Sequence, residues 1–116
     1  MFELGLKQKE WLKVLRSGEY IQGVCALSKQ HHDGYRYCCL GVANKIFNFE
    51  ETDNGYLVDT FHKLGLRDMR GRLKDKFYIN DIEIHSLSSM NDNGCSFNEI
   101  ADYIEQNPEN VFAFSV

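Results

Sequence analysis

The sequence predicts a helix-rich α+β fold, with one globular domain over residues 1–116 and a small antiparallel sheet or hairpin. Apolar residues recur at helical spacing in several segments, and Asp-Gly or Asn-Gly turn signals separate these segments. The 116 residues, 43% of them hydrophobic, suffice for one core. A single proline gives no sign of a linker between domains.

Residues 7–20 (KQKEWLKVLRSGEY) predict the first helix, because Trp11, Leu12 and Leu15 share one helical face and Gly18 is suited to end it. The turn signal at 33–34 follows VCALSKQ and precedes YRYCCL, which predicts a hairpin. In the alternative, the first arm is irregular and only YRYCC forms a strand.

Three further segments complete the first two thirds of the chain. The spacing of Leu40, Ala43 and Phe47 predicts a short helix over 39–47. A turn at 53–55 precedes another helix, marked by Leu57, Phe61 and Leu64 and ended by Gly65. Residues 67–80 (RDMRGRLKDKFYIN) have no clean period and predict a loop or hairpin with a β component.

The C-terminal third predicts two helices and a strand. Residues 81–94 (DIEIHSLSSMNDNG) resemble a helix that ends at Asn93-Gly94. Ser96 and Glu99 form a capping-box pattern that opens the next helix, and Pro108 follows its end. The tail NVFAFSV, residues 110–116, predicts a last strand.

Charge and motifs exclude several function classes. A net charge of −4 gives no general attraction to DNA or anionic lipid. The sequence has no long apolar run and no secretory pattern, so we expect a cytosolic protein without a membrane span, with its four cysteines reduced. Gly-rich phosphate loops, H-E-x-x-H, G-x-S-x-G and calcium loops do not occur, so no cofactor is predicted.

The adjacent Cys38 and Cys39 permit three readings. A thiol at a helix N-terminus can act as a nucleophile, but no histidine is tied to these cysteines by sequence to serve as a base. A zinc site is disfavoured, because ligand pairs normally lie two to four residues apart. We therefore expect no metal and favour two small buried side chains at the join between a short strand and a helix.

A basic run between residues 67 and 76 is the candidate binding site. Arginine forks bind phosphate or carboxylate at two points, and nearby aromatic rings can stack on a base. No recognition helix is apparent, so duplex DNA is disfavoured as a partner. The predicted ligand-binding residues are Arg67, Arg70, Arg72, Lys74, Tyr35, Arg36 and Tyr37.

Three co-linear motifs resemble a family of small uncharacterised proteins of tailed bacteriophages and prophages. They are WLKVLRSGEYIQG, YCCLGVANKI and LSSMNDNGCSFNEIADYIEQ, and they follow that family's pattern of LRSGxYxQ, CCLGV and LNDxGxSFxEIADxIE. The resemblance spans roughly residues 8 to 107. YLVDTFHKLGL is similar to a further motif, LPxxVxxWxGL, but lacks its proline and has Phe61 and His62 near the expected tryptophan.

The resemblance implies a phage origin and action in the cytoplasm of a bacterial host, and it names no activity. By analogy of setting, we expect an accessory binding protein, used in counter-defence or host takeover. Its partner would be a phosphate-bearing nucleotide signal or a host protein, and a homo-oligomer is expected. The alternatives are a small enzyme with a cysteine nucleophile and a nucleic-acid-binding regulator.

Overall fold

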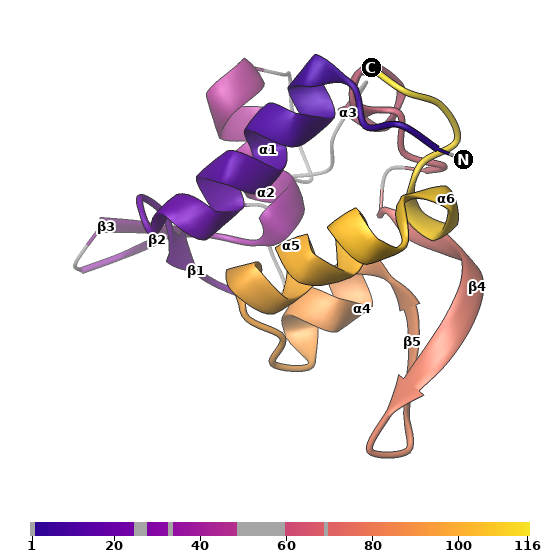
Figure 1. Ribbon diagram of the computed structural model, residues 1–116. Helices are drawn as coiled ribbons and strands as arrows, with labels where there is room; N and C mark the ends of the chain where they lie inside the picture. The colour runs from indigo at the N-terminus through magenta and orange to yellow at the C-terminus, as the bar shows by residue number, and fades with distance from the viewer. Residues whose placement is uncertain (1, 25–27, 33, 49–59, 69) are drawn as a thin grey trace.

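Helices and two small sheets surround one hydrophobic core in the computed structural model (Figure 1), which describes residues 2–24, 28–32, 34–48, 60–68 and 70–116. This arrangement confirms the predicted helix-rich α+β fold. The helices are α1 (Leu6–Ser17), α2 (Cys39–Phe47), α3 (Thr60–Leu64), α4 (Leu87–Asp92), α5 (Phe97–Gln106) and α6 (Pro108–Val111). The strands are β1 (Ile21–Gln22), β2 (Ser28–His31), β3 (Gly34–Tyr37), β4 (Arg72–Ile79) and β5 (Ile82–Ser86).

Helix α1 forms where the apolar spacing predicts it and buries Trp11, Leu12 and Leu15. It ends at Gly18, whose φ of 78° lies in the left-handed region that glycine adopts without strain. Helix α1 packs against α2 and α5. The guanidinium of Arg16 forms ion pairs with Asp102 at 2.9 Å and with Glu105 at 2.6 Å, which join the exposed edges of α1 and α5.

The predicted hairpin is present, because β2 and β3 pair in antiparallel fashion from Ser28 opposite Tyr37 to His31 opposite Gly34. The short strand β1 joins β3 from the other side in parallel, giving the order β1-β3-β2. Helix α2 follows β3 directly and has the predicted bounds. The predicted turn at 53–55, Leu57 and the side chain of Phe61 lie outside what the structure describes.

The prediction of a helix over residues 81–94 is wrong for its first half. Ile82 to Ser86 form β5, which pairs with β4, and α4 begins only at Leu87. Ile84 is buried while Glu83 and His85 are exposed, which is strand alternation. The hydroxyl of Ser86 accepts the N–H of Ser89 at 3.0 Å and caps α4.

The capping box at the start of α5 is confirmed. The hydroxyl of Ser96 accepts the N–H of Glu99 at 3.1 Å, and the Glu99 carboxylate accepts the N–H of Ser96 at 3.0 Å. The prediction of a C-terminal strand is wrong, because Pro108 opens α6 at a position where its missing N–H is not needed. Phe112 then makes an isolated bridge with Leu66.

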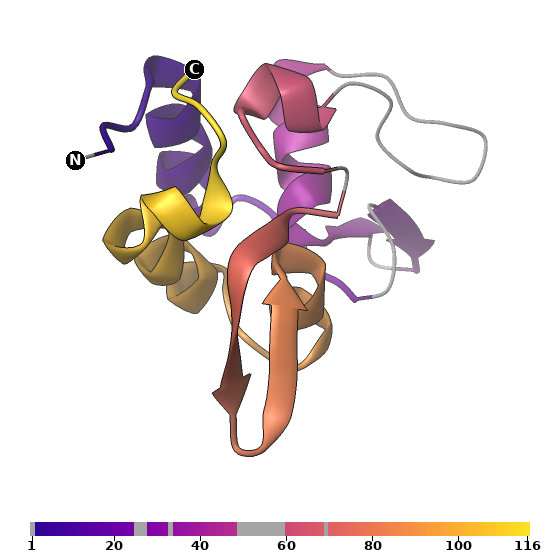
Figure 2. The same cartoon turned by 90° about the vertical axis from the view of Figure 1, so that its right-hand side faces the viewer.

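The core lies between α1, α2, α4 and α5, and the β4–β5 hairpin extends away from these helices (Figures 1 and 2). The three-stranded sheet lies at another edge of the molecule (Figure 1). The largest fully buried apolar side chains are Trp11, Phe112, Leu40, Leu64, Ile84, Leu87, Ile100, Ile104, Val42 and Val111.

Candidate functional site

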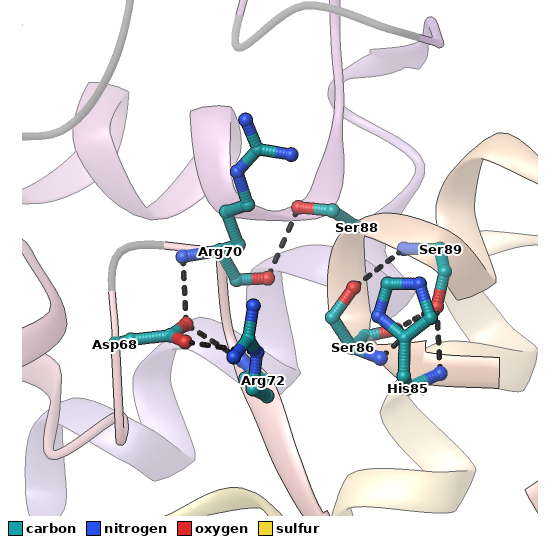
Figure 3. Close-up of polar contacts among 7 residues, drawn as sticks. All are labelled: Asp68, Arg70, Arg72, His85, Ser86, Ser88 and Ser89. Atoms are coloured by element: carbon teal, nitrogen blue, oxygen red, sulfur yellow. Dashed lines mark hydrogen bonds and ion pairs between the residues drawn. The ribbon is translucent and has the colours of Figure 1, made fainter. Parts of the chain in front are cut away.

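A turn at Asp68 and residues 70–72 positions the backbone of two of the predicted arginines. One carboxylate oxygen of Asp68 accepts the backbone N–H groups of Arg70 at 3.0 Å and Arg72 at 2.9 Å (Figure 3). The N–H of Gly71 donates to the Asp68 carbonyl at 3.1 Å. These three amide groups are thus engaged within the turn.

The same turn is docked on the start of α4. The Leu87 N–H donates to the Gly71 carbonyl at 2.9 Å, and the Ser88 hydroxyl donates to the Arg70 carbonyl at 3.0 Å (Figure 3). Gly71 has a φ of 66°, and a Cβ atom there would lie 3.0 Å from the Leu87 side chain. Glycine is therefore needed for close packing, and the turn is a fixed base for the hairpin.

The arginine side chains do not converge on one pocket. The Arg72 Nε atom lies 3.4 Å from an Asp68 carboxylate oxygen, with 68% of the Arg72 side chain exposed. The Arg70 side chain extends away from that ion pair (Figure 3). Arg67 instead donates to the carbonyl oxygens of Glu109 at 3.0 Å and Phe112 at 3.4 Å, so this guanidinium ties the chain before the turn to α6.

Several cationic side chains are exposed on β4. Exposed and half-buried residues alternate over Lys76–Ile79, whereas Lys74 and Asp75 are both exposed where the pairing with β5 shifts. The term outer face, as used below, stands for the exposed residues Arg72, Lys74, Lys76 and Tyr78 of β4 and Glu83 and His85 of β5. Because Arg72 pairs with the buried Ser86, the strand does not place it in one regular row with Lys76.

Lys76 and Tyr78 form a compact polar group on this face. The ammonium group of Lys76 lies 2.8 Å from a carboxylate oxygen of Glu83 and 5.9 Å from the centre of the Tyr78 ring. The hydrogen bond between Lys76 and Glu83 raises the pKa of the lysine and lowers the pKa of the carboxyl. All three side chains are exposed, so this ion pair contributes little to stability and is open to exchange.

Two contacts hold β4 against α5 and α6. The Phe77 ring stacks on Tyr103 of α5 with centroids 4.7 Å apart. The Asn110 side chain accepts the N–H of Asp75 at 2.6 Å and donates to the Asp75 carbonyl at 2.9 Å. Because the amide satisfies both backbone groups of one residue, α6 occupies the edge of β4 at that point.

Tyr35, Arg36 and Tyr37 lie elsewhere, on β3 in the middle of the three-stranded sheet. Tyr37 packs edge-to-face on Tyr20 with centroids 5.2 Å apart, whereas Tyr35 is 53% exposed. The two sheets lie at separate edges of the molecule (Figure 1). The structure therefore does not bring the two halves of the predicted site together.

The paired thiols are buried at the start of α2. Cys38 is the N-cap residue, with its sulfur 3.4 Å from the Gly41 N–H, and the Cys39 thiol contacts the Leu87 carbonyl at 3.7 Å. Burial raises the pKa of Cys38 to about 11 and raises the pKa of Cys39 well above its ordinary value. This outweighs the stabilisation that a helix N-terminus gives a thiolate, and packing is the role the geometry supports.

A groove between β4 and the α5–α6 junction is lined mainly by polar side chains, among them Lys74, Asp75, Glu105 and Glu109. Three carboxylates against one lysine disfavour a phosphate there. Within the described ranges, no three His, Cys, Asp or Glu side chains are grouped as metal ligands. In the same part of the chain, no helix is both long and apolar enough to cross a membrane.

A hydrogen-bond network, buried in part, links three of the sequence motifs. The Asn91 side chain accepts from Gln22 at 2.9 Å and from the Cys39 N–H at 3.2 Å, and it donates to the Gly23 carbonyl at 2.7 Å. The Trp11 indole donates to the Cys39 carbonyl at 2.9 Å. Sequence reasoning missed this network, because its members come from segments far apart in the chain.

The comparisons with known proteins give a family and no activity. Residues 5–64 match the model of a family described as a domain of unknown function, DUF8296. The chain belongs to the DUF8296 family. The matched segment contains α1, the three-stranded sheet, α2 and α3. No curated protein and no solved structure matches the chain. Membership of DUF8296 carries no activity with it, so the functional argument rests on the surface geometry.

Proposed function

We propose that this DUF8296 protein acts by binding and not by catalysis, and that it holds a phosphate-bearing partner with the cations of the outer face and of the turn below it. The observation that carries the proposal is the exposure of three cations, Arg72, Lys74 and Lys76, on one strand, with Lys76 beside the ring of Tyr78. Ammonium and guanidinium groups are the side chains that proteins use for phosphate. The buried thiols of α2 oppose the alternative of a cysteine enzyme.

The setting we propose is the cytoplasm of a bacterial host during phage infection, with a role in counter-defence or host takeover. This part of the proposal rests on the resemblance of the LRSGEYIQ, CCLGV and NDNGCSFNEIADYIE motifs to phage proteins. Its test is phage plating on bacteria that express the chain. We expect higher plating with the natural sequence than with an Arg72→Gln/Lys74→Gln variant, and equal plating contradicts a role for the outer face in infection.

The binding proposal is tested by titration calorimetry of the purified protein with inorganic triphosphate, a nucleoside triphosphate and inorganic polyphosphate. We expect at least one of these anions to bind, with heat that Arg72→Gln/Lys74→Gln removes. Lys29→Gln is the matched control, because Lys29 is an exposed lysine on β2 in the other sheet. No binding by any of the three anions at low salt overturns the proposal.

A host protein or a second copy of the chain is the second candidate partner. It is favoured by exposed apolar side chains on or next to the three-stranded sheet, where Ile21 is 49%, Val24 53% and Tyr35 53% exposed. Light scattering during size exclusion tests self-association. A monomeric mass for the natural sequence contradicts the expected homo-oligomer. An oligomer whose number of subunits Ile21→Ser leaves unchanged contradicts the use of this surface.

A further inference from the structure

The three-stranded sheet has one side that faces away from the core. Gln22 and Tyr37 are neighbours on paired strands; the Gln22 amide donates to Asn91, and Tyr37 packs against the core. Successive side chains of a strand point to opposite faces, so Ile21 and Arg36, which pair one residue earlier, point away from the core. The 49% exposure of Ile21 agrees with this placement.

Two cations are direct neighbours on this side. Lys29 of β2 lies opposite Arg36 of β3, and Ile21 of β1 lies beside Arg36 on the other flank. Opposite residues of antiparallel strands have Cβ atoms about 4.5–5.5 Å apart, and like charges at that separation destabilise the pair. The solvent side of the sheet, as the term is used below, comprises Ile21, Arg36, Lys29 and His31.

The charge of this sheet is opposite in sign to that of the whole chain. Its three strands contain no aspartate or glutamate, although the chain has 17 acidic residues against 13 lysines and arginines. The nearest carboxylates in the sequence are Glu19, before β1, and Asp33, which follows β2 and lies outside the described residues. A carboxylate brought between Lys29 and Arg36 offsets the repulsion of the two cations.

Apolar surface adjoins the cations. Ile21 is 49% exposed, and Val24, which follows β1, is 53% exposed. Protein–protein contacts combine apolar and arginine side chains near their centre with a polar rim. A small inorganic anion would leave this apolar surface in water, whereas a protein segment with both carboxylates and apolar side chains covers it.

We propose that the solvent side of the three-stranded sheet binds an acidic segment of a partner protein, with a carboxylate between Lys29 and Arg36 and an apolar side chain on Ile21. This inference rests on the second candidate partner of the proposed function and specifies its chemistry. Because the chain as a whole is acidic, we expect the attraction to be local and sensitive to salt.

A second copy of the chain is less suited to this side. On the exposed side of α5, where acidic residues gather, Asp102 and Glu105 already form ion pairs with Arg16. The Glu99 carboxylate accepts the N–H of Ser96 in the capping box of α5. Docking of α5 on the cations of another copy would break these contacts, whereas a foreign segment brings carboxylates without that cost.

The test is fluorescence anisotropy of the full chain with a labelled synthetic peptide that repeats Glu-Ser-Leu and so supplies both carboxylates and apolar side chains. We expect binding at low salt that weakens as salt screens the charges. A peptide that repeats Gln-Ser-Leu lacks the charge and should not bind. A peptide that repeats Glu-Ser-Ser lacks the apolar side chains and should bind more weakly.

Variants on the two sheets locate the contact. Lys29→Gln should weaken binding by roughly 3- to 10-fold, and Lys29→Glu by more, because it replaces attraction with repulsion. Lys74→Gln, at an exposed lysine of the other sheet, should leave binding unchanged. Ile21→Ser should weaken binding of the Glu-Ser-Leu peptide and not of the Glu-Ser-Ser peptide. Ile82→Ser, at a residue 44% exposed on β5, is the apolar control.

The outcomes separate this inference from the binding of phosphate by β4. Circular dichroism verifies that each variant folds. No binding of the Glu-Ser-Leu peptide at low salt, or equal weakening by Lys29→Gln and Lys74→Gln, overturns the inference and leaves the phosphate proposal standing. Equal affinity for oligothymidylate also overturns it, because the surface would then accept any polyanion.

Self-association is the remaining outcome. An oligomer that Lys29→Glu dissociates shows that a second copy covers this side, and it overturns the acidic partner. Peptide binding that is lost with Lys29→Glu, together with no binding of triphosphate, nucleotide or polyphosphate, supports the inference and overturns only the phosphate proposal.

Discussion

The side-chain oxygen of Asn91 accepts the backbone N–H of Cys39 at 3.2 Å, so an amide in the last turn of α4 satisfies a donor in the first turn of α2. Asn91 is completely buried. Its two other partners, Gln22 and the Gly23 carbonyl, belong to β1 and the residue after it. One side chain therefore fixes the three-stranded sheet and two helices relative to one another.

Asn91→Ala should lower the free energy of unfolding by about 3–5 kcal/mol, because it leaves the buried Cys39 N–H and the part-buried Gly23 carbonyl without their partner. Urea unfolding measures the change. The control is Asn98→Ala on the exposed side of α5, which we expect to change stability by less than about 0.5 kcal/mol. Similar losses for both variants contradict the central role of the buried amide.

Gly65→Ala should destabilise the fold much more than Gly18→Ala. Both glycines have positive φ, 81° at Gly65 and 78° at Gly18. A Cβ at Gly65 would lie 2.3 Å from the Phe114 carbonyl oxygen and 2.6 Å from the Gln8 side-chain nitrogen, whereas Gly18 has no atom within 4 Å. We expect a loss of about 1–2 kcal/mol at Gly18, from backbone strain alone, and several kcal/mol more at Gly65.

Thermal melts of the two glycine variants measure this difference. The pair separates the cost of a left-handed backbone from the cost of a steric clash. Equal melting temperatures contradict the close approach of the 112–116 segment to Gly65.

Stability should fall as the pH rises from about 9 to about 11. An unfolded Cys38 thiol ionises near pH 9, whereas burial keeps the folded thiol protonated until about pH 11. In that window the unfolded chain loses a proton that the folded chain retains, so the free energy of unfolding decreases by up to about 1.4 kcal/mol per pH unit. Urea unfolding at each pH measures the slope.

Cys38→Ser is the matched variant for this titration, because a serine hydroxyl can cap α2 without ionising in this range. We expect its stability to fall less steeply with pH, and the remaining dependence comes from Cys39, Cys95 and Tyr103, because burial raises the pKa of each of these groups. A thiol reagent should label Cys38 slowly at pH 8 in the folded protein. Labelling as fast as in urea would show that the thiol is accessible and ionised, against the packing role.

Asn110→Ala should loosen β4 from α6. The variant removes both hydrogen bonds to the backbone of Asp75 and the one from Asn110 to the Tyr103 hydroxyl, and it retains the two rings that stack at Phe77 and Tyr103. We expect amide hydrogen exchange around Asp75 to become roughly 5- to 30-fold faster, for a loss of about 1–2 kcal/mol of local stability. Gln106→Ala, an exposed change at the end of α5, should leave that exchange unchanged.

Local patterns predicted those elements whose signals are short-range. The spacing of Leu40, Ala43 and Phe47 identified α2, and the Ser96–Glu99 pair identified the start of α5. The Ile82–Ser86 strand was missed because its alternation occupies only five residues and runs directly into α4. The C-terminal strand was wrongly predicted from the β-rich composition of the tail. Pro108 opens a helical turn there, and this turn includes the first residues of the predicted strand.

The candidate site was predictable only in part. The exposure of Lys76 and Tyr78 follows from strand alternation once β4 is assigned, whereas Lys74 and Asp75 are both exposed where the pairing with β5 shifts. The role of Arg67 in holding α6 depends on tertiary contacts that no local pattern encodes. The same holds for the separation of Tyr35 from these cations, because the relative position of the two sheets is set by the packed helices between them.

Contacts between the two halves of the chain limit where this protein can be truncated. The family match stops at Leu64. Within the matched span, Trp11 packs against Phe112 and Cys39 contacts Leu87, and both partners belong to the other half of the chain. A fragment trimmed to the matched span would expose one side of its own interior to water and aggregate. The span matched by the family model is thus shorter than the segment that folds. Expression of a DUF8296 segment from this chain requires α4, α5 and α6, which cover its apolar side.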